Sequence, residues 1–313
     1  MDRHQRARRR LKLRQLEILL AVADTGSMAK AATQLAITQP AISRAVADAE
    51  QTLGVPLFDR GPHGVEPTEY GRALLKRGIA AFDELDQGIR QIEFLADPTA
   101  GELRIGAPAG ISEGIVLAAI NRLSRQYPRA VFHVVIATGT ALIDQLRERK
   151  IELGFDPLSG LTGEEDVDVE VLHEQPLVVV AGINNPWLRR RKIKLAELVN
   201  EPWTWPPLGS AYDSMVVEAF RANGLKPPRA AIYTHAPNLR ISLAATGPFL
   251  AVVAGSAVSM PDQYPSVRKL PVAFPAKRQW VHLVTLKKRS LSPLAQRFID
   301  CARDISGSLT KRK

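Results

Sequence analysis

The residues best suited to recognition chemistry lie close together near the N-terminus, and a further arginine follows at position 60. Gln39, Ser43 and Arg44 fall at the start of an expected helix and would point away from its apolar face. Arginine can donate two parallel hydrogen bonds to guanine, glutamine can bond adenine in a similar way, and serine adapts to either base. This set is typical of a surface that reads base edges in the major groove of DNA.

Two short helices joined by a turn are expected to position these side chains. Ser27 can cap the first helix, because its hydroxyl accepts from a backbone N–H left free in the opening turn. Ala36-Ile37 forms the turn, Thr38 caps the second helix, and Pro40 is tolerated in its first turn. In a helix-turn-helix, the start of the second helix enters the major groove. The predicted DNA contacts are Ser27, Thr38, Gln39, Pro40, Ser43, Arg44 and Arg60.

An ordinary pair of packed helices would show the same apolar spacing, so the following residues matter. Gly54-Val55-Pro56-Leu57-Phe58 stops the second helix and supplies an apolar anchor. A Gly/Pro-rich loop over residues 59–67 then begins with Arg60. This order favours a winged helix-turn-helix.

A long helix is expected next, capped by Thr68 and ending before Pro98. From Gly71 to Ala96 small or apolar residues recur at alternating spacings of four and three, as in a coiled-coil seam. A helix of about 29 residues is about 43 Å long. Because that exceeds a small head, self-association is favoured over packing on the head alone. The predicted dimer seam consists of Leu75, Gly78, Phe82, Leu85, Ile89 and Ile92.

These motifs resemble the LysR-type transcriptional regulators. The residues that carry the resemblance are Leu13-Arg14-Gln15-Leu16, Gly26-Ser27, Ala31-Ala32, Gln39-Pro40-Ala41-Ile42-Ser43, Leu53 to Phe58, Arg60 and Thr68-Glu69-Tyr70-Gly71. Leu19 and Ala49 depart from the residues usual in the family, but neither is a predicted DNA contact. The resemblance implies a homotetramer on promoter DNA, and contact with RNA polymerase if the protein is an activator.

Beyond Gly101, short apolar strands alternate with helices, a pattern that favours a mainly parallel α/β fold. Strands are expected at 103–107, 131–137, 151–155, 167–173, 177–181, 231–234, 249–253 and 280–286. Helices are expected at 112–126, 140–149, 195–200, 214–223, 239–246 and 293–305. Cys301, the single cysteine, is expected to be buried in the last helix.

The predicted fold class is α/β overall. It comprises an all-α winged helix-turn-helix head at 1–67 (ordered core 11–67), a dimerising linker helix at 68–97 and an effector-binding domain at 101–306. The resemblance implies that this last domain is a two-lobed, periplasmic-binding-protein-like sensor. Lobe I would take about 101–174 and 271–306, and lobe II about 175–270. A small-molecule effector would bind in the cleft between them.

Ligands of α/β sheets bind beyond the carboxyl ends of strands, and helix N-termini near Ser112 and Thr140 offer N–H groups to an anion. Phe155 and Trp205 are candidates for stacking on a ring. The predicted effector contacts are Ala109, Ser112, Thr138, Thr140, Phe155, Trp205, Pro206 and His235. Residues 201–210 resemble a branch of the family named for regulating a galactose-binding protein. An aromatic carboxylate, a sugar and a sugar acid all stay open as effectors.

The net charge of +10 fits nucleic-acid binding. However, residues 1–96 contribute only +2 and residues 97–313 contribute +8, so bulk charge does not single out the head. The exception is an arginine-rich arm over residues 3–14, opposed only by Asp2. It either grips phosphates without sequence preference or serves as a solubilising tail.

Two other functions compete with regulation. Gly110-Ile111-Ser112-Glu113-Gly114 matches the nucleophile elbow of α/β hydrolases, but Pro108-Ala109 separate it from the preceding strand, and an esterase needs no DNA-binding head. We therefore expect no enzyme activity. A solute-binding protein is the third possibility, opposed by the head and by the absence of an apolar signal-peptide core.

Composition bounds the remaining possibilities. No run of about eighteen apolar residues predicts a membrane span, and a cytoplasmic location is expected. The six histidines lack the spacing of metal ligands, and there is no phosphate-cradling Gly-Lys-Ser/Thr motif. No metal or cofactor is expected.

Overall fold

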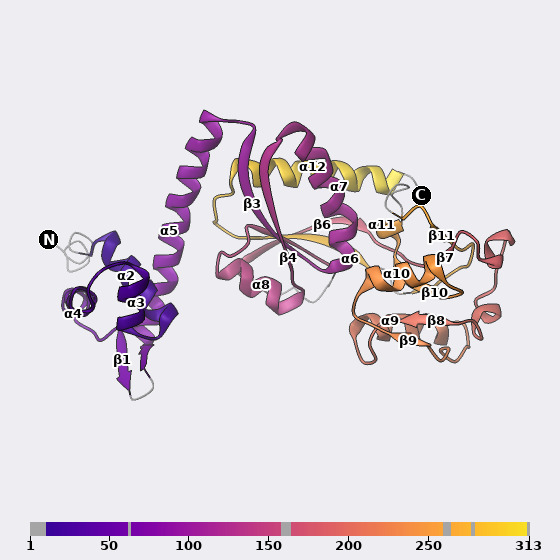
Figure 1. Cartoon of the computed structure of the whole chain (residues 1–313), viewed down its shortest axis with the longest axis horizontal. Coiled ribbons are helices and arrows are strands. Elements are labelled where there is room, and N and C mark those ends of the chain that lie inside the picture. Colours follow the sequence, from indigo (N-terminus) through magenta and orange to yellow (C-terminus); the bar gives the residue numbers. More distant parts are fainter. Residues whose placement is uncertain (1–10, 62–63, 158–163, 259–263, 277–278, 312–313) are drawn as a thin grey trace. The chain divides into compact units, whose positions relative to one another are not determined.

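The computed structural model describes residues 11–61, 64–157, 164–258, 264–276 and 279–311. Most of the arginine-rich arm, residues 3–10, lies outside them. The chain forms two compact units, residues 1–89 and 90–313 (Figure 1). Among the described helices, none is both long and apolar enough to cross a membrane.

The first unit begins with three helices, α2 (Leu13–Thr25), α3 (Met28–Gln34) and α4 (Gln39–Leu53). Val22, Ala31, Ile42 and Val46 are fully buried where the helices meet, and the small side chain at Ala31 permits their close approach. The predicted cap is confirmed, because the Ser27 hydroxyl accepts a hydrogen bond from the backbone N–H of Lys30. These local signals fix where the helices begin and how they pack.

The wing, expected as a loop, is an antiparallel hairpin of β1 (Phe58–Gly61) and β2 (Gly64–Pro67). The head is therefore not entirely helical. The helix α5 (Glu69–Ala96) follows, and the predicted cap is confirmed because the Thr68 hydroxyl accepts from the N–H of Gly71 at 3.0 Å. A Cβ at Gly71 would lie 2.0 Å from the carbonyl oxygen of Leu57, so only glycine lets α5 pack this closely against the wing.

The second unit contains two five-stranded sheets (Figure 1). We call the first, with its helices, lobe I. Its strands, in the order β4-β3-β5-β12-β6, are β3 (Ala100–Ala107), β4 (Arg129–Ile136), β5 (Leu153–Asp156), β6 (Val167–Glu174) and β12 (Trp280–Leu286). Its helices are α6 (Ala109–Ile111), the π-helical turn η1 (Ser112–Val116), α7 (Leu117–Gln126), α8 (Gly139–Arg147) and α12 (Pro293–Lys311). Cys301 is buried in α12, as expected.

Lobe II is built on the second sheet, in the order β11-β7-β10-β8-β9. Its strands are β7 (Leu177–Gly182), β8 (Trp203–Trp205), β9 (Ile232–Tyr233), β10 (Leu250–Ala254) and β11 (Val267–Lys269). Its helices are α9 (Ala211–Arg221), α10 (Pro237–Thr246) and α11 (Gly255–Val258), with 3-10 turns η3 (Pro186–Arg189) and η4 (Leu195–Leu198). Buried Trp203 and Phe220 are central to its core.

The expectation of mainly parallel sheets was wrong. In lobe I, β3 is parallel to β4 and β5, but β12 runs antiparallel to β5 and β6. In lobe II, β7 runs antiparallel to both β10 and β11. The chain enters lobe I again at β12 after passing through lobe II, so no βαβ crossover dictates its direction. The helix expected at 195–200 is only the short turn η4.

Candidate DNA-binding surface and sensor site

The start of α4 presents polar side chains to solvent. Gln39, Pro40 and Arg44 are exposed, and neither Gln39 nor Arg44 has a side-chain partner within the described part of the chain. Thr38 holds the N-cap position with extended backbone, although its hydroxyl makes no capping hydrogen bond. The donors and acceptors of this first turn are therefore free to meet another molecule.

Ser43 lies differently from its neighbours on α4. It is half-buried, and its hydroxyl donates to the sulfur of Met28 at 3.4 Å. Met28 belongs to the head core, so Ser43 lies at the boundary between that core and the exposed surface. Reading a base with this hydroxyl requires it to rotate away from the sulfur.

The turn between α3 and α4 fixes the direction of the second helix. Ala36 adopts a left-handed backbone with φ 51°, a conformation that non-glycine residues rarely take. The N–H of Ile37 donates to the carbonyl oxygen of Ala32 at 3.0 Å, which closes the turn.

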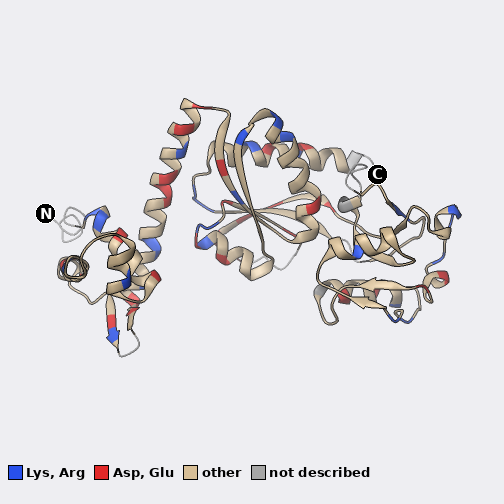
Figure 2. Ribbon diagram, viewed as in Figure 1, with Lys and Arg blue, Asp and Glu red and all other residues tan. Residues whose placement is uncertain are grey.

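The wing is tied to the helices by backbone hydrogen bonds. Val65 donates its N–H to the carbonyl oxygen of Gly26 at 2.9 Å. Arg60 lies opposite Val65 in the hairpin, and its side chain is exposed. The hairpin thus holds a cation on the same unit as the exposed start of α4. Figure 2 shows that basic side chains are not confined to this head, in agreement with the charge distribution along the sequence.

The predicted dimer seam divides into two parts along α5. Leu75 and Gly78 are buried, and a Cβ at Gly78 would contact Leu16 at 3.7 Å, so this part packs within the head. Phe82 is half-buried. Leu85, Ile89 and Ile92 are 46%, 54% and 68% exposed, respectively. Only the later part of the seam is free in the single chain.

The end of α5 is anchored in the second unit. Arg90 donates to the carboxylate of Glu152 at 2.9 Å, and that carboxylate is almost wholly buried. The other oxygen of Glu152 accepts from the backbone N–H of Ser292 at 3.0 Å. Phe94 packs near Tyr127, with 6.2 Å between ring centroids. These contacts join the last turns of α5 to the core of lobe I.

The predicted effector contacts do not form one cluster. Phe155, Trp205 and Pro206 are buried, and the indole N–H of Trp205 donates to Asp213 at 2.8 Å. Their rings are not available for stacking in this conformation, because both sheets use large aromatic residues to fill their cores. Thr138, Thr140 and His235 are exposed, and Ala109 and Ser112 are half-buried.

Ser112 does not have the surroundings of a hydrolase nucleophile. Its hydroxyl donates to the carbonyl oxygen of Pro108 at 3.1 Å, and within the described residues it has no histidine partner. A nucleophilic serine needs a base within hydrogen-bonding reach. The imidazole Nδ1 of His282 lies 3.2 Å from the backbone oxygen of Asp156, not near Ser112.

The start of α8, expected to offer N–H groups to an anion, is partly used by the protein itself. The carboxylate of Asp156, at the end of β5, accepts from the backbone N–H of Gly139 at 2.8 Å. An internal carboxylate thus takes the favourable place at this helix N-terminus. An anionic ligand there would have to share or displace it.

Sequence reasoning missed a polar cluster at the junction of the two lobes. The phenol of Tyr264 in lobe II donates to the carboxylate of Glu113 in η1 of lobe I at 3.3 Å. Burial raises the pKa of Glu113, and burial together with the nearby Glu113 carboxylate raises the pKa of Tyr264 to about 12. Arg240, on α10, stacks its guanidinium 5.4 Å from the ring centroid of Tyr212. Desolvation lowers the pKa of Arg240, and the Glu113 charge acts against that shift.

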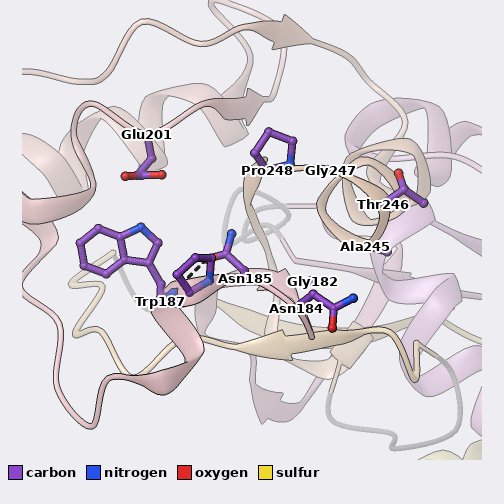
Figure 3. A pocket seen from close by; sticks show the side chains of 10 residues that line it. Gly182, Asn184, Asn185, Trp187, Glu201, Ala245, Thr246, Gly247 and Pro248 are labelled. Carbon is purple, nitrogen blue, oxygen red and sulfur yellow. Dashed lines mark hydrogen bonds between the residues drawn. The ribbon is translucent and has the colours of Figure 1, made fainter.

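A cavity of about 550 Å³ lies in lobe II, away from this cluster (Figure 3). It is bordered by η3 and the ends of β7 and α10. Trp187 and Glu201 line it, and the backbone N–H of Trp187 donates to the side chain of Asn185 at 3.0 Å. Trp187, not the predicted Trp205, is the tryptophan that borders this cavity. Its position beside a proline in a 3-10 turn gave no sign of that in the sequence.

Comparison with known proteins now decides the family. The model described as "Bacterial regulatory helix-turn-helix protein, lysR family" matches residues 13–72. The model described as "LysR substrate binding domain" matches residues 96–306. The chain belongs to the LysR family. It is a DNA-binding transcriptional regulator with an effector-binding domain.

Curated LysR-family relatives match along almost the whole chain. The transcriptional regulator GbpR of Azospirillum brasilense is 28% identical over 304 residues, covering 97% of this chain and 89% of GbpR. The transcriptional activator CmpR of Synechocystis is 29% identical over 305 residues, covering 92% of this chain and 93% of CmpR. Neither relative supports the hydrolase or solute-binding alternatives.

Solved LysR-type structures share the fold. A full-length variant of OxyR from Pseudomonas aeruginosa aligns with a TM-score of 0.61 at 21% identity, covering 94% of each chain. CbnR in complex with its target DNA aligns with a TM-score of 0.53 at 21% identity, covering 94% of this chain and 99% of CbnR.

Proposed function

We propose that this LysR-family regulator reads promoter DNA with the start of α4 and with Arg60 of the wing. The observation that supports this is the exposed, unpartnered pair Gln39 and Arg44 on a helix whose opposite face is locked into the head core. Thr38 and Ser27 lie at the two helix starts, where backbone N–H groups suit phosphate oxygens. Ser43 contributes once its hydroxyl leaves Met28.

The domain assignment that fits this function keeps the boundaries expected from the sequence. Residues 1–67 form the DNA-binding head, 68–97 the linker helix and 101–306 the effector-binding domain. The linker pairs two protomers through Leu85, Ile89 and Ile92, whose exposed apolar side chains have no cover in the single chain. A two-fold pair of heads then matches a palindromic site.

We place the effector at the junction of the lobes. Ala109, Ser112, Thr138, Thr140 and His235 stay candidate contacts, whereas Phe155, Trp205 and Pro206 serve the lobe cores. A ligand that binds one lobe arrangement more tightly than another shifts the population toward it, and only that difference in affinity can drive the change.

The wider assembly follows from the family. Sensor contacts join two linker dimers into a tetramer, and RNA polymerase is a partner if the protein activates transcription. The protein performs no catalysis and works in the cytoplasm, where promoter DNA is accessible.

The test is to select binding sites from random duplex DNA with the full-length protein and to footprint the promoter that contains the best match. The expected result is a short, two-fold symmetric motif, protected on one face of the duplex. Enrichment of no motif would contradict sequence-specific reading. Light scattering of the free and DNA-bound protein measures the assembly independently.

A further inference from the structure

The cation at the lobe junction is unusually poor in partners. Arg240 is only 5% exposed, and its single hydrogen bond runs from Nη1 to the carbonyl oxygen of Val252 at 3.2 Å. Its Nε is buried and has no hydrogen-bond partner. Among the described residues no carboxylate forms an ion pair with it. The guanidinium edge formed by Nε and Nη2 is therefore unused.

A buried charge of this kind is costly unless it is paired and hydrogen-bonded. The stacked ring of Tyr212 offsets part of the cost through a cation–π contact. It cannot satisfy the N–H groups, which lie in the plane of the guanidinium. A carboxylate matches such a planar edge with two parallel hydrogen bonds.

The nearest negative group belongs to the other lobe. Glu113 affects the pKa of Arg240 through its charge but stays outside ion-pair distance, and it accepts the hydrogen bond from Tyr264. Glu113 lies in the π-helical turn η1, a distortion of helix geometry that is frequent at functional sites. The carboxylate of Glu113 thus partly compensates Arg240 without bonding to it.

We propose that Arg240 anchors the carboxylate of an organic-acid effector between the lobes. This inference rests on the proposed function and narrows the effector class to acids, either aromatic carboxylates or sugar acids, and excludes neutral sugars. The ligand carboxylate takes the free Nε and Nη2 edge, and Tyr212 and Tyr264 supply aromatic and hydroxyl contacts. Glu113 gives up its place beside Arg240, so the hydrogen bond that links it to Tyr264 across the lobes is exchanged for ligand contacts.

This exchange explains how binding would reach the rest of the protein. Glu113 lies on lobe I and Tyr264 on lobe II, so a ligand that replaces their contact changes the relative free energies of the lobe arrangements.

The experiment uses three matched pairs of probes with the full-length protein: acetate and acetamide, benzoate and benzamide, glucuronate and glucose. Melting temperatures are measured at equal millimolar concentrations, because a ligand of the folded state raises them by mass action. The variant is Arg240→Gln. The control is Arg221→Gln, which removes the same charge from an exposed position on α9.

The expected result is that at least one acid stabilises the wild type and Arg221→Gln, while its neutral partner does not. Arg240→Gln should weaken binding of that acid about tenfold or more, as measured by calorimetry, because a hydrogen-bonded charge pair is lost. Benzoate against glucuronate distinguishes the two sources of the carboxylate. Stabilisation by a neutral partner, or equal acid binding by Arg240→Gln, would overturn the proposal. A flat response to all three acids would also overturn it, because acetate is small enough for any site built for a larger carboxylate.

DNA binding by the same proteins separates this proposal from the proposed function. Arg240→Gln should bind the selected DNA site as the wild type does and lose only the effect of the acid on that binding. If the wild type binds no specific site, the proposed function fails, whatever the acid measurements show.

Discussion

The carboxylate of Glu50 accepts a hydrogen bond from the backbone N–H of Leu57 at 2.7 Å, and the same oxygen accepts from Phe58 at 3.2 Å. Glu50 lies near the end of α4, and Leu57 begins the approach to the wing. One side chain therefore holds the recognition helix and the wing in a fixed relation.

Replacing this carboxylate should loosen the head. Glu50→Ala leaves two backbone donors without an acceptor and should lower the free energy of unfolding of the head by about 1–3 kcal/mol. Operator affinity should fall as well, because the wing is no longer fixed. Calorimetry with separate transitions for the two units measures the first effect. Glu50→Gln keeps an acceptor oxygen and should lose less, and Glu66→Ala on the exposed side of β2 should lose little. Equal stability of all three variants would contradict this role.

The arginines of the head should differ in how they affect binding. Arg44→Ala should cost about 1–3 kcal/mol at the selected site and relax the preference at one base pair. Arg60→Ala should weaken binding to specific and scrambled duplexes alike and reduce the salt slope by about 1. Competition binding at several salt concentrations measures both, with Arg77→Ala on the exposed face of α5 as a control. A loss of affinity confined to the selected site in Arg60→Ala would place that arginine among the base readers.

The exposed part of the linker should hold the dimer. Ile89→Asp together with Ile92→Asp places two charges in the proposed seam and should shift the protein toward monomers in light scattering. The control is Gln91→Asp, because this exposed residue lies between them on another side of the helix. An intact assembly in the double variant would move the interface elsewhere.

Local signals made the head predictable from sequence. Caps at Ser27 and Thr68 and the apolar spacing of α4 depend on residues within one or two turns, so they can be recognised without knowing the fold. The left-handed Ala36 and the inward hydroxyl of Ser43 depend on packing between helices, and no residue type signalled them.

The sensor site was less predictable for the same reason. Tyr264 and Glu113 are 151 residues apart, and their contact exists only because the chain crosses between the lobes. Trp205 lies in a Pro-rich segment that is typical of an exposed loop, yet it packs edge-on against Trp203 in the core. The direction of β12 likewise depends on the path through lobe II.

The anchor between the linker and lobe I provides a fourth prediction. Arg90→Ala removes the cation beside the buried carboxylate of Glu152 and should lower the stability of the second unit by about 1–3 kcal/mol. Chemical denaturation measures it. Arg90→Lys should recover part of the loss, and Arg125→Ala, on the exposed surface of α7, should change little. A second unit as stable as the wild type in Arg90→Ala would show that this contact is not an anchor.

The lobe junction should show a defined dependence on pH. Burial raises the pKa of Glu113 above its ordinary value of 4.5, so the folded state binds a proton more tightly than the unfolded state. The stability from this proton is fully present below pH 4.5 and is lost as pH rises through the raised pKa. Glu113→Gln cannot ionise, so its stability relative to the wild type should increase between about pH 4 and pH 7. Denaturant midpoints across this range measure the difference, with Glu201→Gln at the separate cavity of lobe II as the control. A difference that stays constant with pH, or that falls as pH rises, would show that Glu113 ionises without cost and that the lobe junction is open to water.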